Sequence, residues 1–273
     1  MFGIPAQRIN LYGRTNHVVA EVQTGPDREV LVDVQDNPET NPLLDSQEWT
    51  EAAETYHISL VIFPLSRVFA LGGFGRYAEA VTCADHAVAI CERYGFESRI
   101  GNVLLHRGPV LFELGDEERG LADLQRGVAL WRRTSGIFML ARNMMMLADY
   151  QLRANQLEQA RTSLAEAERL AETTEEKDHL AEIIRLRGRI WQNDGHRGEA
   201  RRCFERAIAQ SRNQRARLFQ LHAARDLVRL SAEAGGTTGA LKDLRSIVDW
   251  FPPGLDVPVL TECRALLQDN AAG

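Results

Sequence analysis

One histidine and one aspartate near the N-terminus have the residue types and spacing of two members of a catalytic triad. Residues 16–37 read NHVVAEVQTGPDREVLVDVQDN, in which two runs of alternating apolar residues flank a TGPD turn. His17 lies on the first run and Asp33 on the second. In a Cys-His-Asp triad the carboxylate orients the imidazole, and the imidazole activates a thiol. The stretch therefore supplies two members of a triad and lacks the nucleophile.

The length of the turn decides whether these two residues can meet, because partners on neighbouring strands face the same side of a hairpin. A three-residue loop of residues 24–26 places His17 directly opposite Asp33. A two-residue Gly-Pro loop places Val34 opposite His17 instead and turns Asp33 to the other face. The sequence leaves both registers open.

The same N-terminal stretch, beginning FGIPAQRINLYGR, resembles the second half of a transglutaminase-like core. In that family a GIPAR-type segment follows the helix that bears the nucleophilic cysteine, and an H-x-x-x-E-V strand and a V-D strand come next. His17 and Asp33 match the family's histidine and aspartate, and its cysteine would precede Phe2. The chain's own cysteines fall in later helical segments, at Cys83, Cys91, Cys203 and Cys263. We expect a vestigial site without catalysis; the alternative is a transglutaminase-like cysteine hydrolase or transferase whose nucleophile is missing from this chain.

Arginines between residues 185 and 229 are the second group of residues that could do chemistry. Twelve arginines and four acidic residues fall in this segment, in a chain with a formal net charge of −6. Planar guanidinium groups at matched spacing suit carboxylates or phosphates. A solvated charged face would have the same composition. The placement of these arginines on the fold therefore decides between a binding site and ordinary surface.

The helices that must position these arginines follow a 40-residue period. From about Trp49 onward, small residues recur every 40 positions, with apolar residues four positions later and small or apolar ones seven later. These offsets mark one face of a helix, and small residues twelve positions upstream mark a partner helix that can approach closely. The recurring small residues are Ala80, Gly120, Ala160, Ala200 and Ala240, and the upstream set is Val68, Gly108, Ala148, Gly188 and Val228. The unit is a helical hairpin, repeated five times.

The fourth unit carries the pattern most fully, in RLRGRIWQNDGHRGEARRCFERAIAQ. It resembles the tetratricopeptide repeat, whose spacing is G-x2-Y followed by A-x3-F-x2-A. The matching residues are Gly188, Trp191, Ala200, Phe204 and Ala207. The resemblance implies an all-α, right-handed solenoid of about five hairpins with a C-terminal cap. We expect a short β-hairpin segment in residues 1–50 and the repeat domain in residues 51–273.

The C-terminal stretch DWFPPGLDVPVLTECRALL indicates a narrower group of proteins among those with such repeats. With the repeats before it, it resembles the C-terminal region of bacterial multidomain regulators over roughly residues 52–269. Those proteins carry a class III nucleotide cyclase or DNA-binding module, then a signalling ATPase, then these repeats. The resemblance implies the sensor or scaffold arm of a signalling regulator, with an ATPase or cyclase module among its expected partners.

In tetratricopeptide arrays the first helix of each hairpin lines the concave groove. The groove-facing columns here are Leu65, Leu105, Met145, Arg185 and Arg225, and then Phe69, Pro109, Asp149, Arg189 and Arg229. The groove should be apolar at its N-terminal end and cationic at its C-terminal end, where His222 lies beside the arginines. We expect Arg185, Arg189, His222, Arg225 and Arg229 to bind an acidic-hydrophobic segment of a protein or peptide.

Composition argues against several other roles. The net negative charge disfavours nucleic acid as the main partner. No signal peptide or membrane-spanning run is visible, and the scattered cysteines fit a reducing cytoplasm. Cys83, His86 and Cys91 share one predicted helix without a fourth ligand nearby, so core packing is the better interpretation than zinc. We expect no metal, no cofactor and no membrane insertion.

Overall fold

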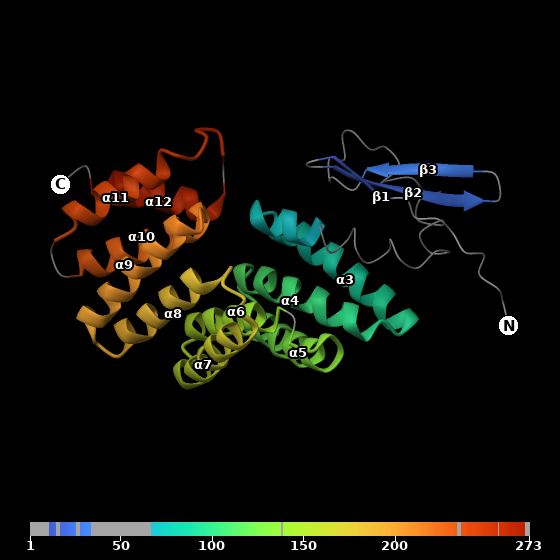
Figure 1. Cartoon of the computed structure of the whole chain (residues 1–273), viewed down its shortest axis with the longest axis horizontal. Helices are drawn as coiled ribbons and strands as arrows, with labels where there is room; N and C mark the ends of the chain where they lie inside the picture. The colour runs from blue at the N-terminus through green and yellow to red at the C-terminus, as the bar shows by residue number, and fades with distance from the viewer. Residues whose placement is uncertain are drawn as a thin grey trace.

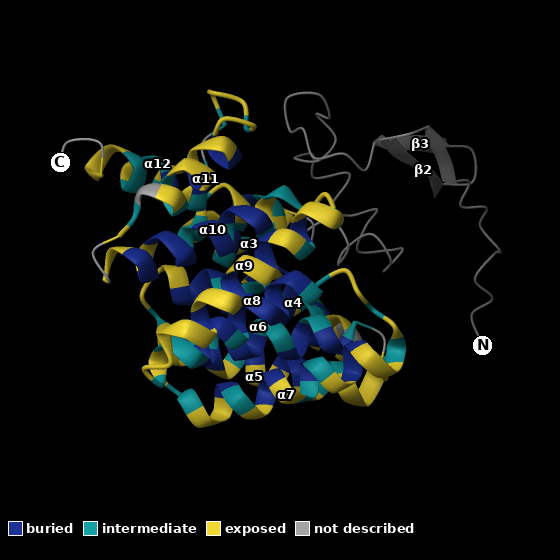
Figure 2. Cartoon of the chain, turned by 60° about the vertical axis from the view of Figure 1, so that its left-hand side comes forward, coloured by how far each residue is buried: buried dark blue, intermediate teal, exposed yellow. Residues whose placement is uncertain are grey.

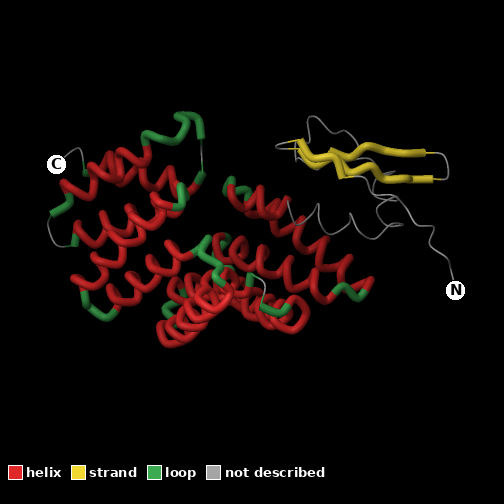
Figure 3. Tube along the Cα trace, viewed as in Figure 1, coloured by secondary structure: helices red, strands yellow, loops and turns green. Residues whose placement is uncertain are grey.

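A computed structural model describes residues 11–14, 17–25, 28–33, 67–137, 139–233, 236–255 and 257–270. From residue 67 onward the described chain is an array of helices joined by short turns (Figures 1 and 3). After helical residues 67–73, they are α3 (Tyr77–Tyr94), α4 (Glu97–Glu113), α5 (Glu117–Ser135), α6 (Leu140–Arg153), α7 (Leu157–Thr174), α8 (Leu180–Asn193), α9 (Arg197–Asn213), α10 (Arg217–Ala232), α11 (Thr238–Val248) and α12 (Pro258–Asp269). Among the helices described, none is long and apolar enough to cross a bilayer.

The helices form hairpins, and the turn within each of the first four hairpins contains a residue with a left-handed backbone. These residues are Gly75, Gly115, Asn155 and Gly195, with φ of 75, 89, 58 and 78°. Glycine adopts this conformation without a steric penalty, and asparagine tolerates it better than most residues. They stand 40 residues apart, so the turns keep the same period as the core.

The predicted small residues lie where the two helices of a hairpin cross. Ala80, Ala160 and Ala200 are fully buried and Gly120 is buried, whereas Ala240 in the last hairpin is partly exposed. The upstream residues of the first helices are all buried: Val68, Gly108, Ala148, Gly188 and Val228. Figure 2 shows the buried residues gathered where neighbouring helices face each other. The predicted helical hairpins and their 40-residue register are confirmed.

Two glycines show how closely the helices approach. A Cβ atom on Gly188 would lie 2.7 Å from Cε1 of Phe204, so the ring occupies the space that any side chain would need. A Cβ atom on Gly108 would lie 2.7 Å from the carbonyl oxygen of Gly120, so backbone meets backbone there. The first and second helices are thus held at short distance by the absence of a side chain.

The curved array brings its two ends together. A Cβ atom on Gly75, in the first described turn, would lie 3.3 Å from Cγ of Pro258, the first residue of α12. These residues are far apart in the sequence but adjacent in space, as the course of the chain in Figure 1 also indicates. The inner side of the array is therefore enclosed by the first hairpin and by the terminal helix.

The N-terminal residues that are described form an antiparallel sheet of β1 (Leu11–Arg14), β2 (His17–Gly25) and β3 (Arg28–Asp33), in that order. Asp33 pairs with Val19, and His17 pairs with Arg14 of β1. Both predicted registers are therefore wrong: Gly25 pairs with Arg28, and a one-residue shift between Gln23 and Gly25 displaces the rest of the ladder. The predicted domain boundary at residues 50 and 51 lies outside the described residues.

Candidate functional site

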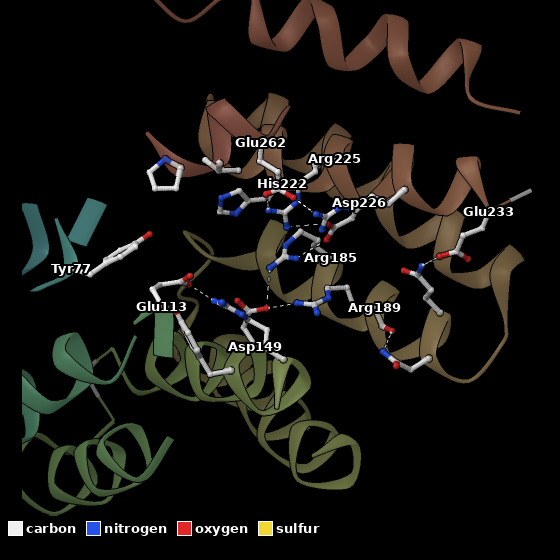
Figure 4. Close-up of a pocket in the computed structure, with 17 residues that line it drawn as sticks. Tyr77, Glu113, Asp149, Arg185, Arg189, His222, Arg225, Asp226, Glu233 and Glu262 are labelled. Atoms are coloured by element: carbon white, nitrogen blue, oxygen red, sulfur yellow. Dashed lines mark hydrogen bonds and ion pairs between the residues drawn. The ribbon is translucent and has the colours of Figure 1, made fainter. Parts of the chain in front are cut away.

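The inner side of the array contains a cavity of about 930 Å³. It is bounded by the first helices of successive hairpins, α4, α6, α8 and α10, together with α12 and one residue of α3. All five residues predicted to bind a partner lie on its wall: Arg185, Arg189, His222, Arg225 and Arg229. Figure 4 labels the first four. The 40-residue period explains this, because equivalent positions of consecutive first helices must lie side by side.

Arg185 is the centre of the site and is almost completely buried, with 3% of its side chain exposed. Its Nε donates to Oε2 of Glu182 at 2.8 Å, and its Nη1 donates to Oδ2 of Asp226 at 2.7 Å. Its Nη2 lies 3.4 Å from Oδ1 of Asp149. One guanidinium group thereby joins α6, α8 and α10 (Figure 4).

The proton affinities of this cluster follow from burial and charge. Burial by itself raises the pKa of each of the three carboxyl groups, but the neighbouring arginines, joined by His222 for Asp149 and Glu182, outweigh it. The pKa of Asp226 lies well below its usual range, and those of Asp149 and Glu182 are also lowered. Burial lowers the pKa of Arg185, and the three carboxylates more than reverse this. The cluster is fully ionised at neutral pH.

Two further ion pairs extend the site toward the N-terminal hairpins. Nη1 of Arg189 donates to Oδ1 of Asp149 at 2.8 Å. Nη1 of Arg153 donates to Oε1 of Glu113 at 2.6 Å. The Arg153 guanidinium carbon also lies 4.7 Å from the centre of the Phe112 ring and 4.8 Å from that of Tyr150. Ring contacts of this kind hold a guanidinium in place in addition to its ion pair.

The C-terminal side of the site is built by α10 and α12. Nη1 of Arg225 donates to Oε2 of Glu262 at 3.0 Å, and Nη2 of Arg229 donates to the other oxygen of the same carboxylate. Arg225 also donates to Oδ1 of Asp226. Nδ1 of His222 lies 3.5 Å from Oε1 of Glu182, a buried oxygen without a hydrogen bond in the described structure.

The prediction of a cationic groove end is wrong for this cavity, because carboxylates from neighbouring repeats match the arginines. The charged lining residues are Arg153, Arg185, Arg189, Arg225 and Arg229 against Glu113, Asp149, Asp226, Glu233 and Glu262. Most of these acids lie outside the segment in which the arginines cluster, so a local count of charges misses them. A search for oppositely charged residues about one repeat length apart in the sequence would have predicted such partners, as for Glu113 and Arg153, which are 40 residues apart.

The apolar end of the predicted groove also needs correction. Leu105 is 1% exposed and packs into the core against Gly127 of α5, so it does not face the cavity. The less polar part of the cavity wall is instead supplied by Tyr77, Tyr150, Pro258 and Val259. Two of these residues come from α12. The prediction considered only the first helix of each hairpin and therefore could not include them.

The cysteines that are buried in the repeats are unsuited to act as the nucleophile of a triad. Burial raises the pKa of the Cys91 thiol to about 11 and that of Cys263 to about 12, and it also raises the pKa of Cys203. Thiols of this kind remain protonated at neutral pH and react poorly. Within the described residues, no group of three or more histidine, cysteine or acidic side chains could hold a metal ion. The assignment of His17 and Asp33 as a vestigial site remains a prediction.

The fold is similar to that of solved repeat proteins. No protein-family model and no protein of curated function matches the sequence. The apo form of RapI superposes with a TM-score of 0.62 and 12% identity, over 84% of this chain and 79% of that one. A Rap protein complexed with competence and sporulation factor gives a TM-score of 0.60 and 14% identity, over 84% of this chain and 62% of that one. TTC0263, a thermophilic TPR protein of Thermus thermophilus, superposes with a TM-score of 0.51 and 21% identity, over 75% of this chain and 97% of that one.

At these identities the likeness establishes the fold alone. The chain has a tetratricopeptide-like helical repeat fold, as the sequence predicted. These structures do not bear on the resemblance to cyclase and ATPase regulators or to a transglutaminase-like core, and both stay predictions.

Proposed function

We propose that this chain is a non-catalytic interaction module whose inner cavity binds an acidic and apolar segment of a protein or peptide. The observation that carries the proposal is the cavity of about 930 Å³, with all five predicted residues on its wall. Its volume is in the upper part of the range of known ligand sites. The fold comparison adds support, since a Rap protein of similar fold is known as a complex with competence and sporulation factor.

The five residues have different roles in this proposal. Arg185 is too deeply buried to touch a partner, and it holds α6, α8 and α10 in fixed positions. Arg189 and Arg229 are 26% and 50% exposed, so they can receive a partner carboxylate. Because the charged groups are already held by their neighbours, little conformational entropy is lost when a segment binds.

Apolar side chains of the segment would pack on the less polar wall. Tyr77 and Tyr150 supply ring surfaces, and Pro258 and Val259 supply aliphatic ones. Aromatic residues of this kind bury large areas at interfaces and dominate their affinity. The guanidinium groups suit the carboxylates of such a segment, and this wall suits its apolar side chains.

The resemblance of the sequence to the repeat region of bacterial cyclase and signalling-ATPase regulators supports a more specific role. The chain would be a cytoplasmic sensor or scaffold arm, and the bound segment would belong to an ATPase or cyclase module. The N-terminal segment, with His17 and Asp33, would be a vestigial transglutaminase-like element without activity of its own.

A binding measurement with defined peptides tests the proposal. The probe is a fluorescein-labelled peptide of alternating leucine and glutamate, with a leucine-glutamine peptide for comparison, measured by fluorescence anisotropy. Replacing Arg189 and Arg229 together by Glu should weaken binding of the acidic peptide by about tenfold or more at low salt, through like-charge repulsion. Binding to the parent chain should also weaken as salt rises.

The matched control is the double replacement of Arg206 and Arg212 by Glu. Both residues are exposed on α9, a second helix that does not line the cavity, and the change in net charge is the same. This control should bind like the parent. Equal binding by both double variants would show that the peptide responds to overall charge and that the cavity is not the site.

A further inference from the structure

We infer that Glu262 of the terminal helix is a built-in competitor of the partner segment, occupying guanidinium groups that a partner carboxylate would take. The inference rests on the proposed function and describes how the same site is regulated. One carboxylate of α12 contacts Arg225 through one oxygen and Arg229 through the other. Both arginines lie on the cavity wall, and so does Glu262 itself.

The terminal helix presents this carboxylate from a fixed position. Pro258, Val259 and Glu262 line the cavity, and their spacing places them on one face of α12. Leu260 and Cys263 are fully buried in the core shared with α10 and α11, so the helix is anchored. A partner therefore needs to move the Glu262 side chain and can leave α12 in place.

Glu262 is the carboxylate of the cluster that can be exchanged. Asp226 and Glu182 are buried, and both contact Arg185, so displacing either would disrupt the centre of the site. Asp149 likewise contacts Arg185 as well as Arg189. Glu262 is 33% exposed and contacts the two arginines of α10 at the edge of the cluster.

Arg225 and Arg229 would respond differently if the Glu262 carboxylate moved away. Arg225 would keep its hydrogen bonds to Asp226 at 3.0 and 3.1 Å. Among the residues that the structure describes, no second carboxylate lies within ion-pair distance of Arg229. Departure of Glu262 thus exposes one unpaired guanidinium group, which is the position that a partner carboxylate would fill.

An exchange of this kind has a consequence for affinity and specificity. The partner gains one ion pair while the chain loses one, so the charged contact adds little net free energy. Binding must then draw on the apolar contacts with Tyr77, Tyr150 and the N-terminal residues of α12. Segments that are only acidic would be rejected, because they cannot supply the apolar contacts.

The test uses the labelled leucine-glutamate peptide on the full chain with three single substitutions. Glu262→Gln removes the competitor and should tighten binding about fivefold at low salt, the effect of roughly one exposed ion pair. Arg229→Gln breaks the same pair from the other side and should weaken binding. Because both variants lose the same ion pair, opposite effects on affinity cannot come from a shared loss of stability.

Glu113→Gln is the charge control. Glu113 and Arg153 are each 31% exposed and pair on the opposite side of the cavity, so this change adds the same charge to the wall. Arg153 stays held over the Phe112 and Tyr150 rings, so the variant should tighten binding by less than about twofold. Circular dichroism melts of the three variants establish that each is folded.

The outcomes separate the inference from the function on which it rests. Equal tightening by Glu262→Gln and Glu113→Gln would overturn the competitor role and leave the cavity as a binding site governed by net charge. Weaker binding by Glu262→Gln would also overturn it, because Glu262 would then support the site. Absence of peptide binding by the parent and by Glu262→Gln alike would overturn the proposed function, and the inference with it.

Discussion

The inner helices α4 and α8 carry very different side chains at the same position of the repeat, and both side chains are buried. Leu105 of α4 is 1% exposed, and Arg185 of α8, two repeats later, is 3% exposed. Leu105 packs against the neighbouring helix where Gly127 leaves room, since a Cβ there would lie 2.9 Å from Cγ of Leu105. Arg185 is surrounded by three carboxylates from three helices.

The comparison shows that the repeat can enclose this position for an apolar or a charged residue: Leu105 and Arg185 are buried, whereas Met145 and Arg225 at the equivalent positions are partly buried. The spacing of the helices encloses the position, and the side chain then dictates its neighbours. A leucine needs only apolar contacts and a small residue opposite. A buried guanidinium must be paired, because an isolated charge in the interior is very costly. In α8 this enclosed position therefore holds Arg185, the centre of an ion network, and the cavity lies beside that network.

The largest expected effect comes from making the two regions alike. Arg185→Leu places in α8 the residue that α4 accepts, but it leaves Asp149, Glu182 and Asp226 without their shared cation. We expect a loss of about 3–5 kcal/mol in the free energy of unfolding, measured by urea denaturation. A change below about 1 kcal/mol would mean that the two positions are equivalent after all.

Leu105→Ala tests the apolar side of the comparison. Truncation leaves a cavity that the tightly packed α4 and α5 cannot fill, so we expect a loss of about 2–4 kcal/mol in the same measurement. Leu114→Ala, at a position 49% exposed just beyond the end of α4, should cost less than about 0.5 kcal/mol. Equal losses from the two variants would contradict the burial of Leu105.

Ala200→Trp tests whether the crossing of α8 and α9, next to the ion-paired region, is as tight as the register requires. Ala200 is fully buried on α9, and a larger side chain should cost about 1–3 kcal/mol by overpacking. The matched control is Ala209→Trp, which introduces the same residue at an exposed position of the same helix. An unchanged urea midpoint for Ala200→Trp would count against the register.

Acid should weaken the ion-paired region and leave the apolar one unaffected. The pKa of Asp226 lies well below its usual range in the folded chain, so its contribution is complete above the pKa of the unfolded chain and falls as pH decreases. Between about pH 5 and 3.5 this one group should account for a loss of about 1 kcal/mol. Asp226→Asn should flatten the pH dependence of unfolding by that amount, whereas Leu105→Ala should keep the slope of the parent.

The smallest effect is expected where the ion network reaches solvent. Glu262→Gln removes ion pairs to Arg225 and Arg229, of which the second is half exposed. Water and salt screen such pairs, so the free energy of unfolding should change by less than about 1 kcal/mol. A loss as large as that of Arg185→Leu would show that the network has no exchangeable edge.

The fold could be predicted from the sequence almost completely in its repeats. Small residues every 40 positions and apolar residues at offsets of four and seven are local signals, and each hairpin obeys them independently. Ala240 is the exception, because it is partly exposed in the last hairpin. The N-terminal register was wrong because Gly25 pairs with Arg28, so the two strands meet later in the chain than either predicted loop allows, and the one-residue shift between Gln23 and Gly25 reverses only part of this difference.

The site could be predicted only in part. Arg185, Arg189, His222, Arg225 and Arg229 do lie on one wall, because helical spacing and the 40-residue period determine which residues neighbour each other. Their carboxylate partners depend on the distance and angle between helices, and the charge of the groove was therefore misjudged.

By itself, the sequence determined the hairpins, their spacing and the inward position of the arginines of α8 and α10, since these follow from the chain's own periodicity. Tertiary structure alone decided which charges meet, how deeply Arg185 is buried, and that the chain curves until Gly75 reaches Pro258 and α12 closes the cavity. The curvature sums small rotations between successive hairpins, and each rotation depends on the packing of many side chains at once.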